Sequence, residues 1–357
     1  MSQLLSYYES AAYGAFLAGV ESVPSLPAPL AVNAIDALKK IHKCDFIDVN
    51  SQSSLLAYAM AATIAEKRTF IATSNINALE EVHKASFMRL PLVAVNFSRS
   101  LGTLTIKTDL SGVFALRDAG WLLFLCESVQ EVMDSIIMAY RIAEDNKVLL
   151  PTIVNIDGIA NMREIVNVPN KKIIDNFLPK LRLPKKLKDN AAFGSPVLDE
   201  YQEFREQQQL AMKNAAKLVK ATGEKWYEKF KRSFGLVEHY FLADAEYAFV
   251  TAGFYSSTAK AAINKLRQQG EKVGLLRLRV VRPWPYEDVF DALKNLKKVA
   301  VIDRGVSLGA TGFMHNELRS SHSFCSSFIS YKPLSEKDFL DIFQRLKKQE
   351  KPETVWL

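Results

Sequence analysis

Cysteine is scarce in this sequence of 357 residues, which has only three, Cys44, Cys126 and Cys325, far apart from one another. Without a CxxC pair, the sequence offers neither a zinc site nor a local iron–sulfur cluster. Long apolar runs are missing as well, since none reaches the roughly 20 residues that span a bilayer. The opening MSQLLSYYES lacks the basic stretch and apolar core of a secretory signal. We therefore expect a soluble cytoplasmic protein with no membrane contact and with any metal cluster on another chain.

Charge is unevenly distributed, with a formal net charge of +7. The excess is concentrated in one short stretch, whose basic residues are Lys171, Lys172, Lys180, Arg182, Lys185, Lys186 and Lys188. A basic linker of this kind is usually just solvated, and these residues lack the interleaved aromatics that are typical of nucleic-acid binding. The sequence therefore gives little support to a nucleic-acid partner.

The first half of the chain alternates between short apolar runs and helical patterns. We predict strands over 46–49, 68–73, 92–95, 122–126 and 152–156, and helices over 1–19, 30–41, 55–65 and 129–144. Such an alternation favours a parallel α/β sheet covered by helices on both faces. The helix over 55–65 is rich in alanine and carries almost no charge, so we expect it to be buried against a neighbour, often another subunit.

A second alternation follows after an irregular region. Residues 166–196 contain four prolines and are expected to form an extended linker, and 200–234 are expected to be one long charged helix or a pair of helices. Strands are then predicted over 247–251, 273–281 and 298–303. The predicted organisation is one domain over 1–165, a linker and connecting helix over 166–243, and a smaller α/β domain over 244–357.

Polar residues follow three of the predicted strands of the first domain, at 50–54, 74–77 and 96–102. Because parallel strands end at one edge of a sheet, these stretches should line the edge where such folds bind ligands. The last stretch contains a single arginine, Arg99, and a guanidinium at this place can hold a carboxylate or a phosphate. The alternative is a surface loop arginine that binds nothing in particular, and the stretch alone leaves both interpretations open.

Several segments together resemble the alpha subunits of 2-oxoacid:ferredoxin oxidoreductases, among which pyruvate:ferredoxin oxidoreductase is the nearest member. Residues 271–312 resemble that family's second domain, which has the transketolase C-terminal-like fold. Residues 200–220 and 234–247 resemble its connecting helix and domain entry. The segments MRLPLVAVNFSRSL (88–101), FALRDAGW (114–121) and VLLPTIVNIDG (148–158) resemble its pyrimidine-binding domain. The resemblance covers nearly the whole chain in the right order.

The resemblance implies an α/β chain with a parallel-sheet, thiamine-pyrimidine-binding domain and a smaller transketolase C-terminal-like domain. Enzymes of this family use thiamine diphosphate to decarboxylate a 2-oxoacid, transfer the acyl group to coenzyme A and pass electrons to ferredoxin. In multi-subunit forms, beta, gamma and delta partners hold the Mg²⁺ and the [4Fe–4S] clusters, and thiamine diphosphate is shared between the alpha and beta subunits. The absence of a GDG-type diphosphate motif from this chain fits that division.

The resemblance also assigns residues. Arg99 falls where the family has the arginine that pairs with the substrate carboxylate, and Asn96 matches beside it. Gln52 stands where the family usually has a glutamate that contacts the aminopyrimidine ring nitrogen and assists catalysis. Glutamine can form a hydrogen bond with a ring nitrogen, but it cannot stabilise a protonated one as a carboxylate does.

Two other cofactor-facing segments depart from the family pattern. The loop with Pro24 has Leu26 where the family has a substrate-contacting threonine, so it offers no hydrogen bond there. The turn with Ser74 and Asn75 lacks the family's glycine. Arg99 and Gln52 are thus the candidate catalytic residues, and Pro24, Leu26, Gln52, Ser74 and Asn75 are the candidate cofactor-binding residues. Two functions follow: a working alpha subunit, or a catalytically degenerate paralogue that acts as a structural subunit.

Overall fold

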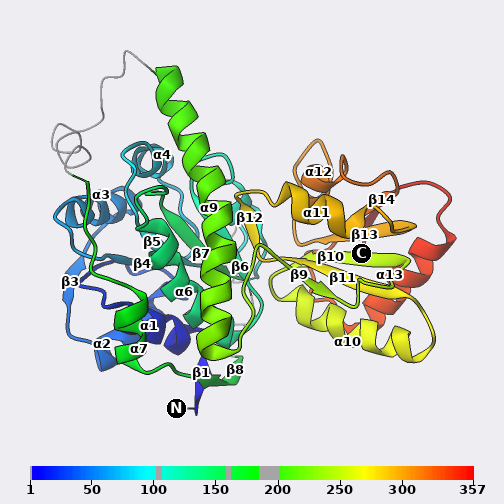
Figure 1. Cartoon of the computed structure of the whole chain (residues 1–357), viewed down its shortest axis with the longest axis horizontal. Helices are drawn as coiled ribbons and strands as arrows, with labels where there is room; N and C mark the ends of the chain where they lie inside the picture. The colour runs from blue at the N-terminus through cyan, green and yellow to red at the C-terminus, as the bar shows by residue number, and fades with distance from the viewer. Residues whose placement is uncertain (1, 102–106, 158–161, 185–200) are drawn as a thin grey trace.

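The computed structural model of the chain describes residues 2–101, 107–157, 162–184 and 201–357. It confirms the predicted α/β architecture, with two units side by side, each built on a largely parallel sheet (Figure 1). Part of the predicted basic stretch, namely Lys185, Lys186 and Lys188, lies outside the described residues. Among the helices in the described ranges, none is both long and apolar enough to cross a bilayer.

The first unit is organised around a five-stranded sheet in the order β12-β6-β7-β5-β4. Four of these strands run parallel, and nearly all their residues are buried, as expected for a sheet covered on both faces. They are β4 (Phe70–Thr73), β5 (Val93–Phe97), β6 (Leu122–Cys126) and β7 (Thr152–Ile156). Beyond β4, the strand β2 (Ser22–Ser25) pairs in parallel with β3 (Asp45–Asp48).

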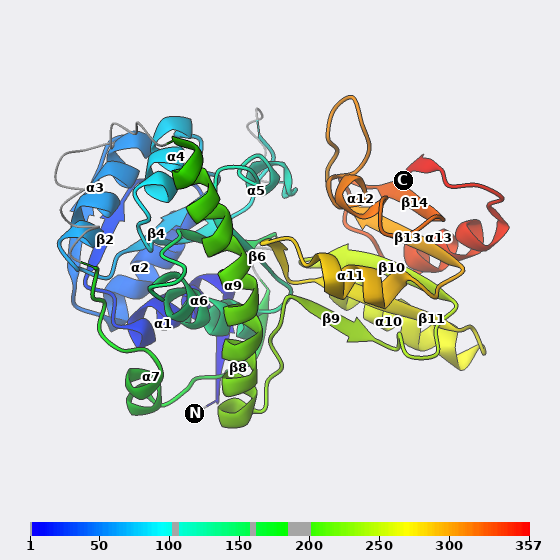
Figure 2. The same cartoon turned by 45° about the horizontal axis from the view of Figure 1, so that its top comes forward.

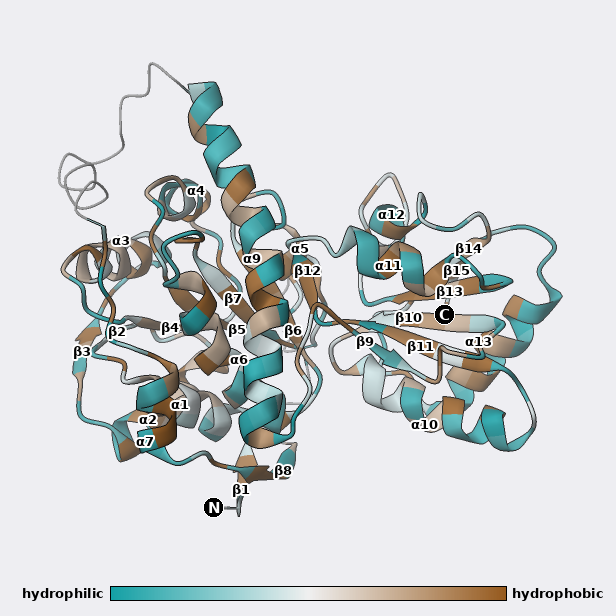
Figure 3. Ribbon diagram, in the orientation of Figure 1, coloured by the Kyte–Doolittle hydropathy of each residue, from teal (hydrophilic) through white to brown (hydrophobic). Residues whose placement is uncertain are grey.

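Helices cover both faces of this sheet, which is visible when the view is turned (Figure 2). One face packs against α1 (Tyr7–Ala18), α2 (Ala31–Ile41), α6 (Val129–Ala143) and the long helix α9 (Tyr201–Phe230). The other face packs against α3 (Gln52–Ile64), α4 (Leu79–Phe87) and the short α5 (Ser111–Phe114). Helix α9 lies across the outside of the first unit and is mostly hydrophilic along its visible side (Figure 3).

Two sequence predictions in the first half are wrong. The region 1–19 is not one helix, because a strand β1 (Ser2–Ser6) precedes α1 and pairs antiparallel with β8 (Arg163–Asn167). Ser6 and Glu9 form a capping box, which starts the helix at Tyr7. The predicted extended linker over 166–196 begins within β8 and contains a helix, α7 (Lys171–Phe177), which follows the N-cap residue Asn170.

The second unit has a six-stranded sheet in the order β15-β14-β13-β10-β11-β9. Its strands are β9 (Val237–Tyr240), β10 (Tyr247–Ala252), β11 (Val273–Leu278), β13 (Lys298–Asp303), β14 (Cys325–Ile329) and β15 (Thr354–Trp356). The helices are α10 (Tyr255–Gln268), α11 (Tyr286–Leu293), α12 (Phe313–Leu318) and α13 (Glu336–Lys348). Strand β9 runs antiparallel at one edge, and the other neighbouring pairs of this sheet run parallel.

The two units are joined by a shared sheet and by a continuous apolar cluster. The predicted strand over 273–281 is divided into β11, in the second sheet, and β12 (Val280–Arg282), which pairs antiparallel with β6 in the first sheet. One apolar cluster continues from the first unit, through residues such as Trp121, to Val281, Val289 and Met314 of the second. The division at 165 and 243 therefore remains our proposal for the domains, with β12 reaching back into the first sheet.

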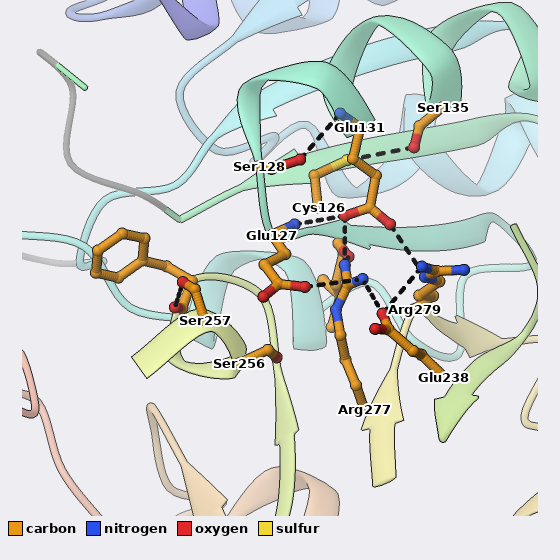
Figure 4. A network of polar contacts seen from close by, with 12 residues as sticks. Cys126, Glu127, Ser128, Glu131, Ser135, Glu238, Ser256, Ser257, Arg277 and Arg279 are labelled. Carbon is orange, nitrogen blue, oxygen red and sulfur yellow. Dashed lines mark hydrogen bonds and ion pairs between the residues drawn. The ribbon is translucent and has the colours of Figure 1, made fainter. Parts of the chain in front are cut away.

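A buried ion-pair network also joins the units (Figure 4). Arg277 on β11 is 1% exposed and contacts Glu131 of α6, and its Nη1 lies 3.1 Å from Glu127 and 2.9 Å from Glu238. Arg279 pairs with two of these carboxylates, with its Nε 3.2 Å from Glu131 and its Nη2 2.9 Å from Glu238. Burial opposes the ionisation of Glu238, but Arg279 and Arg277 outweigh it and lower the pKa of Glu238 to about 2. The network therefore remains charged and fixes one unit against the other.

Candidate functional site

Asparagine side chains gather at the carboxyl ends of three neighbouring strands. Asn96 of β5 lies in register with Thr73 of β4 on one side and with Asn155 of β7 on the other. Nδ2 of Asn96 donates to Oδ1 of Asn155 at 2.7 Å, and the Ser98 hydroxyl donates to the same oxygen at 2.7 Å. These side chains are buried in otherwise apolar strands, so the sheet carries a polar network at the predicted edge.

Asn75 links this network to its surroundings. It has φ +69°, a left-handed conformation that asparagine tolerates better than most residues. Its backbone N–H donates to Oδ1 of Asn96 at 2.6 Å, and its Nδ2 donates to the backbone carbonyl of Arg99 at 2.5 Å. A Cβ at Gly112 would lie 2.3 Å from Oδ1 of Asn75, so α5 approaches this side chain closely. One residue thus connects the ends of β4 and β5 with the start of α5.

Gln52 is the first residue of α3 and reaches the same turn. Its Nε2 donates to the carbonyl of Asn75 at 3.0 Å and lies 3.4 Å from the hydroxyl oxygen of Thr73. A carbonyl can only accept, so the amide nitrogen must face it and the orientation of the Gln52 amide is determined. The other atom, Oε1, is buried and has no hydrogen-bond partner among the described residues. Gln52 therefore presents a free acceptor.

Arg99 follows the end of β5 and is half-buried. Within the part of the chain that the structure describes, its buried Nε has no hydrogen-bond partner, and the same holds for Oδ1 of Asn75, Nδ2 of Asn155 and Oε1 of Gln52. Each such atom costs about 1–3 kcal/mol if it stays unpaired. Four of them at one edge of a sheet indicate a place that binds a polar ligand, with acceptors and donors both on offer. Arg99 is the one charged side chain among these four.

The other predicted site residues lie on the adjoining segments. Pro24 is buried in β2, opposite Ile47 in register, and Leu26 packs against the apolar cluster that includes Leu55 of α3. The hydroxyl of Ser74 donates to the carbonyl of Pro29 and so ties the turn after β4 to the proline-rich segment after β2. The structure thus connects Gln52, Asn75, Asn96 and Arg99 directly, and places Pro24, Leu26 and Ser74 in the packing beside them.

Two charged residues that the sequence did not suggest complete this edge. Asp157 follows β7, Arg304 follows β13 of the second unit, and Nη1 of Arg304 donates to the Asp157 carbonyl at 2.7 Å. The same nitrogen lies 3.5 Å from Oδ2 of Asp157. Burial raises the pKa of the Asp157 carboxyl, and Arg304 opposes that rise. Asn155 was also missed, although a polar residue inside the apolar strand TIVNI was a usable signal. Ser98, in contrast, lies in the predicted polar stretch 96–102.

Thiol and metal chemistry find little support in the described residues. Burial raises the pKa of Cys325 to about 12 and that of Cys44 to about 11, so both remain neutral thiols at physiological pH. Burial also raises the pKa of Cys126. Within residues 2–101, 107–157, 162–184 and 201–357, no group of three or more His, Cys, Asp and Glu side chains could hold a metal ion.

Comparison with known protein families gives two matches. Residues 24–224 match the family described as "Pyruvate flavodoxin/ferredoxin oxidoreductase, thiamine diP-bdg". Residues 245–332 match "Pyruvate:ferredoxin oxidoreductase core domain II". The polar residues described above at the strand ends are called the strand-end network below, and all of them lie in the first match: Gln52, Asn75, Asn96, Ser98, Arg99 and Asn155. The second match contains Arg304.

Curated relatives extend over most of the chain. Pyruvate synthase subunit PorA of Methanothermobacter thermautotrophicus is 33% identical over 333 residues, which is 88% of this chain and 86% of that protein. PorA of Methanocaldococcus jannaschii is 33% identical over 98% of this chain and 95% of that protein. Ketoisovalerate oxidoreductase subunit VorA of Pyrococcus horikoshii is 29% identical over 90% of this chain and 85% of that protein.

Two solved structures share the fold. A 2-oxoglutarate:ferredoxin oxidoreductase from Magnetococcus marinus superposes with a TM-score of 0.74 at 14% identity, and covers 96% of this chain. This chain spans 65% of that structure's chain. A split-gene transketolase superposes with a TM-score of 0.57 at 11% identity and covers 95% of this chain and 96% of its own. Both parts of the predicted fold, the thiamine-binding sheet and the transketolase-like unit, are thereby confirmed.

Proposed function

The chain belongs to the pyruvate:ferredoxin oxidoreductase family, and we infer that it is the alpha subunit of a 2-oxoacid:ferredoxin oxidoreductase. Its relatives are named as subunits, so it works within a multi-subunit complex. The reaction is the oxidative decarboxylation of a 2-oxoacid to acyl-CoA with electrons passed to ferredoxin, or the reverse synthase reaction. Pyruvate is the preferred 2-oxoacid in this proposal, because the pyruvate synthase relatives are 33% identical and the ketoisovalerate relative 29%.

The strand-end network fits the pyrimidine end of thiamine diphosphate. Oε1 of Gln52 would accept a hydrogen bond from the ring nitrogen when that nitrogen is protonated. Asn75 and Ser74 would form the wall beside the ring, with Pro24 and Leu26 as its apolar part. When bound, the cofactor supplies the electron sink for decarboxylation. The diphosphate, Mg²⁺ and [4Fe–4S] clusters belong to beta, gamma and delta partners in this proposal, and the complex is cytoplasmic.

Arg99 would bind the carboxylate of the 2-oxoacid. A guanidinium can do so with two parallel hydrogen bonds, and the unpaired Nε is one of the two donors that this arrangement needs. Asn75 holds the backbone of Arg99 through its carbonyl, and Asn96 holds Asn75 in turn. The side chain that binds substrate is therefore attached to a fixed backbone, which limits the loss of freedom on binding.

One observation supports the proposal: among the residues that the structure describes, four buried polar atoms without hydrogen-bond partners lie at the strand ends of the region that matches the family's thiamine diphosphate-binding domain. A degenerate structural subunit would be expected to have closed such a site with apolar side chains, because unpaired buried groups destabilise the fold. The structural alternative is therefore not favoured. In this proposal Gln52 provides a neutral acceptor where the resemblance implies a carboxylate.

The test is to co-express the chain with its partner subunits and to purify the assembled, thiamine-loaded complex. Ferredoxin reduction is then measured with pyruvate, 2-oxoisovalerate and 2-oxoglutarate, with and without coenzyme A. Turnover that depends on both coenzyme A and one 2-oxoacid is expected, fastest with pyruvate. An intact complex without turnover on any of the three acids would contradict the proposal.

A further inference from the structure

Arg304 connects the second unit to the end of β7 in the first. Besides its bond to the Asp157 carbonyl, its guanidinium lies over the ring of Tyr255, with 5.2 Å between Cζ and the ring centroid. The backbone N–H of Phe254 donates to Oδ1 of Asp157 at 3.1 Å. Gly253, at φ +58°, packs so closely that a Cβ there would lie 2.2 Å from that oxygen. Two loops of the second unit therefore dock on one strand end.

The same docking holds the segment that returns from Arg99. The hydroxyl of Thr108 donates to the Asp157 carbonyl at 3.1 Å, and the N–H of Leu110 donates to the Arg304 carbonyl at 3.0 Å. On the outgoing side, the N–H of Ser100 donates to the carbonyl of Lys107 at 2.8 Å. The residue after Arg99 is thus paired with the returning segment, and Arg304 holds that segment.

A second contact reaches Arg99 through α5. The ring of Phe313, the first residue of α12, stacks on Phe114 with 4.8 Å between centroids and 6° between planes. At the other end of α5, Gly112 lies against the Asn75 amide, whose nitrogen holds the Arg99 carbonyl. The packing of the second unit therefore positions α5 against Asn75, and Asn75 holds the backbone carbonyl of Arg99.

Asp303 gives Phe313 a fixed position. This buried residue ends β13, and its carboxyl accepts the N–H of Met314 at 2.7 Å and that of His315 at 3.1 Å. A Cβ at Gly312 would lie 2.1 Å from Oδ2 of Asp303, so only glycine allows this approach. Asp303 and Arg304 are neighbours in sequence, and so one strand end sets both contacts with the first unit.

We propose that the second unit acts as a clamp on the two segments next to Arg99, residues 98–101 and 107–110. In this proposal Arg304 is a positioning residue for recognition of the substrate carboxylate. The inference rests on the proposed function, because it concerns the same Arg99. It gives the transketolase-like domain a definite role in a chain that shares its cofactor with a partner: it orders the substrate-binding wall of the first domain. Arg304 itself does not contact the substrate in this account.

Hydrogen–deuterium exchange on the full assembled complex tests the clamp without reference to turnover. In Arg304→Met, the loss of one hydrogen bond should speed exchange about fivefold in peptides that cover 93–101 and 107–116. Arg304→Lys keeps one donor toward the Asp157 carbonyl and should restore part of the protection. Arg345→Met is the matched control, since Arg345 is exposed on α13 and pairs with Glu353 at 3.4 Å within the second unit.

Steady-state kinetics provide the second test. Arg304→Met should raise the KM for the 2-oxoacid about fivefold with a smaller change in kcat, and it should leave the KM for coenzyme A unchanged. If Arg304→Met fails to fold, Phe313→Leu removes the ring stack and should speed exchange over 111–116. Unchanged exchange in the folded variants would overturn the clamp, even in an active enzyme. A parent complex without any 2-oxoacid turnover would instead overturn the proposed function, and the exchange result would still decide the clamp.

Discussion

The amide nitrogen of Gln52 donates to the backbone carbonyl of Asn75 at 3.0 Å, and this single bond determines which atom Gln52 offers to a ligand. Because the nitrogen is engaged, the free atom is the oxygen, which is buried and unpaired. A glutamate would offer an oxygen here too, with a negative charge in addition. Compared with the glutamate that the resemblance implies at this position, glutamine keeps the acceptor, loses the charge and gains the hydrogen bond to the Asn75 carbonyl.

Gly112→Ala should impair the site without unfolding the protein. The added Cβ would lie 2.3 Å from Oδ1 of Asn75, so the Asn75 amide must move and release the Arg99 carbonyl. We expect the kcat/KM for the 2-oxoacid to fall about tenfold, which corresponds to about 1.4 kcal/mol. Gly235→Ala is the control, because a Cβ there meets only the Val237 carbonyl oxygen at 3.5 Å. Equal kinetics for the two variants would argue against the role of Asn75.

Arg99→Lys should weaken substrate binding more than it slows turnover. Lysine keeps the positive charge but cannot form two parallel hydrogen bonds with a carboxylate. The loss of one charge-assisted bond, about 1.5–3 kcal/mol, predicts a rise of roughly 10- to 100-fold in the KM for the 2-oxoacid. Steady-state kinetics over a range of 2-oxoacid concentrations would measure it. An unchanged KM would mean that Arg99 is only a loop arginine.

Arg277→Met should strongly destabilise the joint between the two units. Arg277 is buried among Glu127, Glu131 and Glu238. Its removal leaves Lys260 and Arg279 as the cations that face these three buried carboxylates, so negative charge is in excess there. Breaking a buried pair on one side costs about 3–5 kcal/mol in the free energy of unfolding. Urea unfolding would measure this, with the exposed Arg345→Met expected to change it by at most about 1 kcal/mol. A similar small effect for both variants would show that the network contributes little.

Acid should weaken the same joint. The pKa of Glu238 falls from its ordinary 4.5 to about 2 in the folded protein. The folded state therefore binds fewer protons than the unfolded state, so the stabilisation is present above pH 4.5 and is lost as the pH falls toward 2. Glu238→Gln removes this dependence. Urea unfolding between pH 6 and about 3 should show a steeper loss of stability for the parent than for Glu238→Gln, and parallel curves would contradict the assignment.

The sequence predicted the central strands well because their patterns are local. The runs over 122–126 and 152–156 are short and largely apolar, the second is also rich in β-branched residues, and the structure has strands at those positions. Tertiary pairing was not predictable in the same way. The run over 273–281 appears continuous, yet Arg277 pairs within the second sheet while Val280 crosses to the first. The local sequence pattern predicts a strand here, but it does not determine the sheet in which each residue pairs.

The site was predictable in part, because the loops that follow parallel strands lie at the same edge of the sheet. That rule placed Asn75, Asn96 and Arg99 together, and their hydrogen bonds show the arrangement. Arg304 could not be found in this way, because it comes from a strand of the second unit about 200 residues away in the chain and reaches the edge only through domain docking. The orientation of the Gln52 amide also depends on a neighbour, the Asn75 carbonyl, that sequence alone does not place.

The most direct test of the account is the rate of thiamine- and coenzyme A-dependent ferredoxin reduction by the assembled complex, with the parent chain, Gln52→Leu and Gln52→Glu compared at saturating 2-oxoacid. Leucine removes the acceptor oxygen, so the account predicts a loss of about 100-fold, the size found when a preorganised catalytic group is removed. Glutamate keeps an acceptor and adds charge but loses the hydrogen bond to the Asn75 carbonyl, so its rate should stay well above that of Gln52→Leu. Equal rates for the parent and Gln52→Leu would contradict the claim that this strand-end site takes part in the reaction.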